Sequence, residues 1–167
     1  MKVAIIYHSE TGNVREMAEL VRQGCLRIPN VEAMTMPVDE TDEAFLAESA
    51  AVILGSPTYE GSCSWQMKKF LDTGPTGLAG KLGGVFVSQN WPGGGGGSFA
   101  EMTLIAGMLV HGMVIYSGGI AEGIPYLHFG AVSQKAPDED IYRDRCLKLG
   151  HNIAAKAVEL FGEAGDR

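Results

Sequence analysis

The feature that most restricts the fold is the alternation of two kinds of apolar segment along the chain. The first kind is a short, continuous apolar run, which is typical of a strand buried on both faces of a parallel sheet. Such runs occur at Val3–Tyr7, Ala51–Leu54, Val85–Val87 and Met113–Tyr116, and a weaker strand is expected at Val31–Met36.

The second kind has apolar residues that recur with the spacing of one helix face. The clearest stripe runs from Val14 to Ile28, and further helices are expected at 65–71, 99–110 and Asp140–Phe161, with a short one at Asp42–Glu48. Regular alternation of strands and helices gives right-handed crossovers and parallel strands. The sequence therefore predicts an α/β fold: a five-stranded, doubly wound parallel sheet of order 2-1-3-4-5 with helices on both faces.

Length and charge narrow the possible functions. A chain of 167 residues is the usual size of one domain, so we expect a single domain spanning 1–167. The net charge of −7, without any cluster of Lys and Arg, excludes nucleic acid as a partner.

The longest apolar stretch, Met102–Ile120, contains Gly107, His111 and Gly112, so it is interpreted as a helix and a strand rather than a membrane span. The apolar run at the N-terminus is too short for a signal peptide, and we expect a cytoplasmic protein.

The cysteines indicate neither disulfides nor a metal. Cys25, Cys63 and Cys146 are widely spaced and form no C-x-x-C pair, and no grouping of His, Cys, Asp and Glu has metal-ligand spacing. Reduced thiols fit a cytoplasmic location. Cys63 lies near a candidate loop, but no neighbour in the sequence would activate it, so we expect it to be inert.

In a doubly wound sheet, ligands bind beyond the carboxyl ends of the strands, so the loops after the first, third and fourth strands are the candidates. The first loop, Ser9–Val14, offers hydroxyls, an amide side chain and a glycine directly before a helix N-terminus. These groups suit a phosphate bound by neutral dipoles, without Lys or Arg. The alternative is an ordinary helix cap made by Ser, Thr or Asn, and this loop alone does not decide between them.

The other two loops, Gly55–Ser62 and Ser88–Gly97, each combine an aromatic residue with Gly and Ser, and the second adds amide side chains. A flavin ring needs such a flat stacking surface together with a closely approaching backbone. The glycine run after Trp91 has the composition of a flexible linker, but a linker inside a compact domain is disfavoured. The segment Gly74–Leu82 departs from the P-loop pattern, and no G-x-G-x-x-G follows the first strand, so ATP, GTP and a Rossmann-type nicotinamide site are disfavoured.

These loops resemble those of a known family. Ser9–Asn13 resembles the FMN-phosphate loop of flavodoxins. The later segments are similar to the tryptophan-repressor-binding-protein (WrbA) type of NAD(P)H:quinone oxidoreductase, and the similarity covers nearly the whole chain. Those segments are Gly55–Gly61, Gln66–Asp72, the glycine-rich loop, His111–Ile115 and Ile124–Tyr126.

The resemblance implies a flavodoxin-like fold and an FMN site built from the three loops and one histidine. The residues it implies are Ser9, Glu10, Thr11, Gly12, Asn13, Val14, Pro57, Thr58, Tyr59, Glu60, Gly61, Ser62, Ser88, Gln89, Asn90, Trp91, Gly93 and His111. His111 also ends an expected helix, where a cation would interact favourably with the dipole, so both interpretations stay open.

Three departures from the WrbA type bear on function. Pro37–Ser49 is shorter than the segment that helps build the tetramer of that type, which leaves homo-oligomerisation open. Tyr59 stands where an Arg is usual, and Trp91 replaces a small residue, so aromatic side chains flank the expected ring as in electron-carrier flavodoxins.

The resemblance implies an oxidoreductase that passes electrons from NADH or NADPH through FMN to a quinone-like acceptor. The alternative is a flavodoxin-type carrier of single electrons between redox protein partners, and a weaker one is a regulatory FMN protein with little turnover. No catalytic side chain is expected, because flavin N5 is the reactive centre and the protein positions it.

Overall fold

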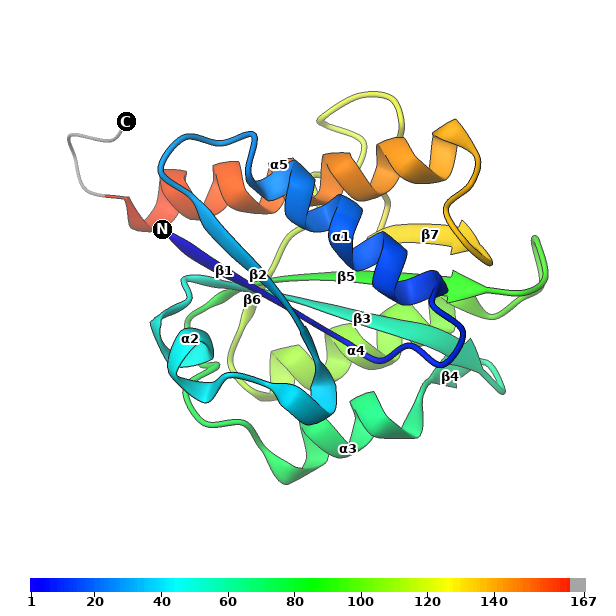
Figure 1. Cartoon of the computed structure of the whole chain (residues 1–167), viewed down its shortest axis with the longest axis horizontal. Helices are drawn as coiled ribbons and strands as arrows, with labels where there is room; N and C mark the ends of the chain where they lie inside the picture. Colours follow the sequence, from blue (N-terminus) through cyan, green and yellow to red (C-terminus); the bar gives the residue numbers. More distant parts are fainter. Residues whose placement is uncertain (163–167) are drawn as a thin grey trace.

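The computed structural model describes residues 1–162 and contains a parallel sheet flanked by helices (Figure 1). The strand order is β2-β1-β3-β5-β6, and every neighbouring pair along this path is parallel. The predicted doubly wound α/β sheet of order 2-1-3-4-5 is therefore confirmed. The strands of this path are β2 Glu32–Pro37, β1 Lys2–Tyr7, β3 Ala51–Tyr59, β5 Leu82–Gln89 and β6 Val114–Ile115.

The predicted number of strands is too low, because the fifth position of the sheet is shared by two strands. β6 pairs with the first two residues of β5, and β7 (Ala131–Gln134) pairs with its last four. Between them, residues 116–130 leave the sheet, where Gly118 and Gly119 have φ of 88° and 54°. The strand predicted at Met113–Tyr116 is only the first of these two pieces.

The remaining strand, β4 (Ser62–Cys63), forms an antiparallel hairpin with the end of β3. Two residues are too few to produce an alternating pattern, which is why the sequence did not reveal it. β3 itself runs to Tyr59, five residues beyond the predicted end at Leu54, because its last residues pair with β4 and β5.

Helices cover both faces of the sheet (Figure 1). α1 and α5 lie on one face, and α2, α3 and α4 lie on the other. The bounds are α1 Asn13–Cys25, the short 3-10 helix η1 Val38–Glu40, α2 Glu43–Glu48, α3 Trp65–Thr73, α4 Gly97–Val110 and α5 Asp140–Phe161. No helix within residues 1–162 is long and apolar enough to cross a membrane.

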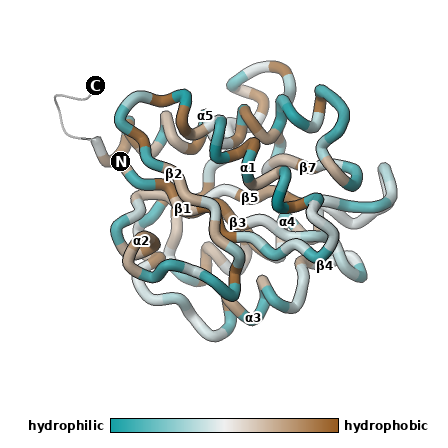
Figure 2. Tube along the Cα trace, in the orientation of Figure 1, coloured by the Kyte–Doolittle hydropathy of each residue, from teal (hydrophilic) through white to brown (hydrophobic). Residues whose placement is uncertain are grey.

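The alternation of side chains along the central strands forms two separate cores. In β1, Val3 and Ile5 face α1 and α5, whereas Ala4 and Ile6 face the opposite helices, and all four are fully buried. The hydropathy colouring in Figure 2 shows hydrophobic segments along β1 and β2 in the middle of the molecule and hydrophilic segments on the outer loops and helices. Burial on both faces explains why these strands are continuous apolar runs.

Two glycines allow α1 and α5 to pack with their backbones in contact. A Cβ on Gly150 would lie 1.9 Å from the carbonyl oxygen of Val21, and a Cβ on Gly24 would lie 2.0 Å from that of Leu147. No real side chain tolerates such distances, so any larger residue must separate the two helices.

We therefore expect Gly150→Ala to lower the free energy of unfolding by about 2 kcal/mol, because overpacking outweighs the gain in helix propensity. The measurement is urea unfolding, followed by circular dichroism. Gly94→Ala is the matched control, since no atom lies within 4 Å of its Cβ position, and it should change stability by less than about 0.5 kcal/mol. Equal stability of the two variants would contradict the close helix contact.

A buried carboxyl group lies on the inner side of α4. Glu101 is 2% exposed, and burial raises its pKa from 4.5 to about 8, although the nearby Arg145 guanidinium acts in the opposite direction. In the unfolded chain the group ionises near 4.5, whereas in the folded protein it keeps its proton until about pH 8. The folded state thus binds more protons in this range, and stability falls as the pH rises from 4.5 to 8.

We expect Glu101→Gln to remove this part of the pH dependence. The stability difference between the variant and the parent should grow by up to about 4 kcal/mol between pH 5 and pH 8. Urea unfolding of both proteins across this range measures it. A difference that does not change with pH would mean that Glu101 is already ionised at pH 5.

Candidate functional site

Three loops meet at one edge of the sheet because they follow three adjacent parallel strands. The loops after β1, β3 and β5 leave the carboxyl ends of strands that lie side by side in the order β1-β3-β5. The chain also passes from β1 to the neighbour on one side and then to β3 on the other side, so this is the switch point of the sheet. All predicted site residues except His111 belong to these loops or to the strand and helix ends beside them.

The loop after β1 presents free backbone amides. The N-cap of α1 is Gly12, with φ of 97°, and no side chain caps the helix in the usual way. Ser9 Oγ accepts a hydrogen bond only from the amide of Arg15, at 3.3 Å. Within the described residues, the amides of Asn13 and Val14 have no hydrogen-bond acceptor. The ordinary cap by Ser, Thr or Asn is therefore absent from this end of α1, and these amides remain available to a ligand.

A positive charge lies beside this loop, where the sequence predicted neutral dipoles only. A Cβ placed on Gly12 would lie 3.5 Å from Nη2 of Arg15, so the guanidinium is close to the turn. Arg15 forms no ion pair with any residue in the described part of the chain. A cation in the first turn of a helix opposes the helix dipole, so the position of Arg15 is unfavourable unless an anion lies beside it.

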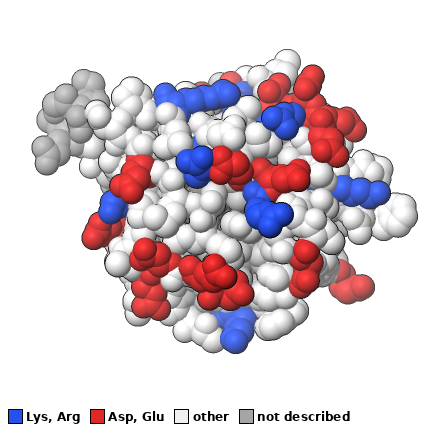
Figure 3. Space-filling view, viewed as in Figure 1, with Lys and Arg blue, Asp and Glu red and all other residues white. Residues whose placement is uncertain are grey.

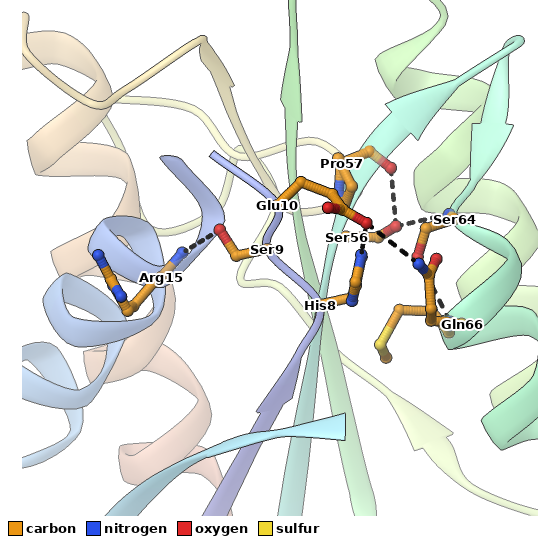
Figure 4. A network of polar contacts seen from close by, with 9 residues as sticks. His8, Ser9, Glu10, Arg15, Ser56, Pro57, Ser64 and Gln66 are labelled. Carbon is orange, nitrogen blue, oxygen red and sulfur yellow. Dashed lines mark hydrogen bonds and ion pairs between the residues drawn. The ribbon is translucent and has the colours of Figure 1, made fainter. Parts of the chain in front are cut away.

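The carboxylate of the same loop points away from Arg15 (Figure 4). Glu10 Oε1 lies 3.1 Å from Nε2 of His8 and accepts a hydrogen bond of 3.3 Å from Nε2 of Gln66, on α3. Held in this way, Glu10 ties the loop to α3 and keeps its negative charge on the side opposite to Arg15. The sequence assigned neither His8 nor Gln66 to the site, and Gln66 lies 56 positions from Glu10 along the chain.

The hairpin of β3 and β4 forms the second wall of the site. Pro57, Thr58 and Tyr59 are the last residues of β3, and Glu60 and Gly61 make the turn with φ of 48° and 73°. The hydroxyl oxygen of Thr58 is buried without any hydrogen-bond partner among the described residues.

Two further residues of this hairpin, Tyr59 and Ser62, interact with neighbouring parts of the chain. Tyr59 is 41% exposed, and its partial burial and the nearby Glu10 carboxylate raise its pKa. Ser62 Oγ lies 3.3 Å from Oγ1 of Thr103, which joins the hairpin to α4.

The loop after β5 forms the third wall and touches the hairpin. A Cβ on Gly96 would lie 2.9 Å from Cα of Gly61, so the two loops are in contact through glycines. Trp91 is 74% exposed, and Gly93 has φ of 70° with open space around it. Because Gly96 caps α4 and Gly97 begins it, the glycine run leads directly into a helix and is not a linker.

Several polar groups at the end of β5 are used within the protein. Ser88 Oγ donates to the carbonyl of Lys135 at 2.8 Å, and Gln89 Oε1 accepts from the amide of Gly97 at 2.9 Å. The carbonyl of Asn90 accepts from Nε2 of Gln134. The side chains of Ser88 and Gln89 thus fix the end of β5 to Lys135, directly after β7, and to α4, whereas Asn90 makes this contact through its backbone.

His111 does not join the loops within this chain, and the ring contact implied for it stays a prediction. It ends α4, and its Nε2 lies 2.8 Å from the carbonyl oxygen of Leu71. α4 starts at the site and, with 14 residues, extends about 21 Å to the opposite edge of the sheet. His111 lies at the C-terminus of α4, which is the other position that the sequence allowed for it.

The cysteines offer no reactive thiolate. Burial raises the pKa of Cys63, and it raises those of Cys25 and Cys146 to about 12. The expectation that Cys63 is inert thus agrees with its burial.

Comparison with known proteins agrees with this geometry. The sequence profile of the family described as Flavodoxin matches residues 5–102. A flavodoxin of Clostridium saccharobutylicum is 38% identical over 164 residues, which cover 96% of this chain and 100% of that protein. An NAD(P)H dehydrogenase (quinone) of Geotalea daltonii is 34% identical over 163 residues, with 78% of this chain and 74% of that protein covered.

Solved structures of other proteins share the fold of this chain. A flavodoxin from the domain Archaea superposes with a TM-score of 0.75 at 27% identity, covering 94% of this chain and 99% of that one. A flavodoxin, WrbA-like protein from Agrobacterium tumefaciens gives a TM-score of 0.78 at 23% identity, with 95% and 98% covered, and so shares the fold. The flavodoxin-like fold is confirmed, whereas the narrower likeness to the WrbA type is not singled out by these relatives. The chain belongs to the flavodoxin family.

Proposed function

We propose that the three loops bind FMN, the cofactor that the family implies, with its phosphate on the loop after β1. The free amides of Asn13 and Val14 and the unpaired guanidinium of Arg15 match a phosphate dianion. At the second wall, the partnerless hydroxyl of Thr58 and the open space at Gly61 fit a ligand with polar edges. The residues present therefore fit this cofactor.

The flat ring would lie between the hairpin and the loop after β5. Tyr59 and Trp91 are exposed aromatic residues, one on each of these two touching loops, and they would supply stacking surfaces. Bound FMN supplies reversible uptake and release of electrons, while the protein holds and orients it. The charge of Glu10 is kept by His8 and Gln66 on the side away from Arg15, which limits its repulsion of a phosphate.

We infer that the protein is an electron carrier that exchanges electrons with redox protein partners through this FMN. The observation that carries the proposal is the pair of flanking aromatics, Tyr59 and Trp91, because they shield a ring from small molecules while leaving an edge for electron transfer. The 38% identity with a flavodoxin over its whole length supports the same conclusion.

The second candidate function is that of an NAD(P)H:quinone oxidoreductase. The 34% identity with the NAD(P)H dehydrogenase (quinone) of Geotalea daltonii supports it. It requires an open face above the ring, on which a nicotinamide and a quinone can alternate. The open surroundings of Gly93 and Gly94 in the loop after β5 favour such access.

An anaerobic titration of the FMN-reconstituted protein separates the two candidates. For the carrier, we expect that neither NADH nor NADPH bleaches the visible flavin absorption, whereas dithionite reduces it through a form with a long-wavelength band. Direct bleaching by either nucleotide, reversed by a quinone, would establish the oxidoreductase instead. Failure to bind FMN would contradict both.

Arg15 provides a test of the phosphate position. We expect Arg15→Gln to weaken FMN binding by about 1 kcal/mol, or roughly fivefold, and to reduce its dependence on salt, because an exposed charge-assisted contact is lost. Titration of the flavin fluorescence at two salt concentrations measures both effects.

Two controls make this test specific. Arg27→Gln removes the same charge from an exposed position beyond the other end of α1 and should leave the affinity unchanged. Riboflavin lacks the phosphate, so its binding should be the same for Arg15→Gln and the parent. Equal loss of riboflavin and FMN affinity would place the phosphate elsewhere.

A further inference from the structure

A fourth connection reaches the edge of the sheet where the three loops converge. β7 lies beside β5 (Figure 1), is parallel to it and pairs with its last four residues, so both strands end at the same edge. The register pairs Gln134 with Gln89, which are the last residues of the two strands. Lys135 directly follows β7 and therefore lies beside the start of the loop that carries Trp91.

The backbone of Lys135 is held in a conformation that few residues other than glycine adopt. Its φ is 59°, in the left-handed region. Its amide donates a hydrogen bond to the carbonyl of Gln89 at 2.8 Å, and its carbonyl accepts from Ser88 Oγ at 2.8 Å and from Ser133 Oγ at 2.7 Å. Both serines are buried. Residues whose surroundings hold them in such a conformation are concentrated at ligand sites, so the side chain of Lys135 is a candidate for a contact with a ligand.

The side chain of Lys135 carries an isolated positive charge. It is exposed, and it forms no ion pair with any residue in the described range 1–162. Lys135 is the only Lys or Arg between Lys81 and Arg143. Residues 138–140 are all acidic, and Figure 3 shows acidic side chains gathered over the end of α5 where this helix begins. The half of the site formed by β5, β7 and their loops thus has one cation in acidic surroundings.

The width of the sheet decides which part of bound FMN this cation can meet. β7 is three strands away from β1 in the order β1-β3-β5-β7, and neighbouring strands lie about 4.8 Å apart. The end of β7 is therefore about 14 Å from the end of β1, where the phosphate loop starts. The four-carbon stem of a lysine spans less than half of this distance. The loop after β5 is the immediate neighbour, so Lys135 is placed at the ring end of the site.

We propose that Lys135 is the cation at the ring end of the FMN site and that its ammonium group favours the reduced cofactor. This role rests on the proposed binding of FMN. A ring that takes up two electrons from a redox partner and one proton from water becomes one charge unit more negative. A nearby ammonium group stabilises that added charge and raises the midpoint potential. Arg15 would hold the phosphate equally in both redox states, whereas Lys135 distinguishes between them.

A potentiometric titration of the FMN-reconstituted protein at neutral pH tests the proposal. Lys135→Gln should reduce the preference for the reduced over the oxidised form about fivefold, which lowers the potential of the two-electron couple by about 20 mV. Lys135→Arg keeps the charge and should keep the potential of the parent. Arg27→Gln is the matched control, because it removes the same charge from an exposed position beyond the far end of α1, and it should leave the potential unchanged.

Flavin affinity provides a second measurement that separates Lys135 from Arg15. Lys135→Gln should weaken the binding of reduced FMN and of reduced riboflavin by the same factor of about five, because the phosphate is out of reach. Circular dichroism checks that each variant is folded. The potential of the parent in folded Lys135→Gln, or an equal shift in Arg27→Gln, would overturn this inference alone. A loss of affinity confined to FMN would do the same, since the cation would then act on the phosphate. A parent protein that binds no FMN would overturn this inference together with the proposed function.

Discussion

The parallel pairing of β1, β3 and β5 is the constraint on which the rest of the structure depends. Parallel neighbours cannot be joined by tight turns, so each connection crosses a face of the sheet as a helix and both faces become buried. As a consequence, every strand in this set ends at the same edge, and the three loops that follow them converge there. The site is thus a product of the sheet, and its walls are fixed by backbone pairing rather than by contacts between loops alone.

At that edge, a negative and a positive side chain lie close in the sequence but are held apart in the structure. The loop after β1 contains the carboxylate of Glu10, the first turn of α1 contains the guanidinium of Arg15, and simple proximity would pair them. Instead His8 and Gln66 hold Glu10 toward α3, and Arg15 stays free beside Gly12. The amides of the helix N-terminus and this guanidinium then act in the same direction, so the loop is suited to an anion although the protein as a whole is acidic.

The fourth helix of the chain links the site to the rest of the surface. It begins at the loop after β5, where Gln89 binds its first amide, and it ends at His111 on the opposite edge. Its inner face belongs to the core, whereas its outer face is apolar and uncharged. Both faces look alike in the sequence, because the pattern of apolar residues indicates a helix but not which of two apolar sides the fold will cover.

The sequence by itself determined the fold class, the strand order and the three loops, because strands buried on both faces and amphipathic helices leave periodic patterns that local residues alone produce. Only the tertiary structure decided what depends on residues far apart. It divided the fifth strand in two, extended β3 into a hairpin with β4, and placed His111 at the end of α4 away from the loops. It likewise brought Gln66 to Glu10 and Gly96 to Gly61. Such contacts come from packing between elements, and packing has no period that a single sequence can show.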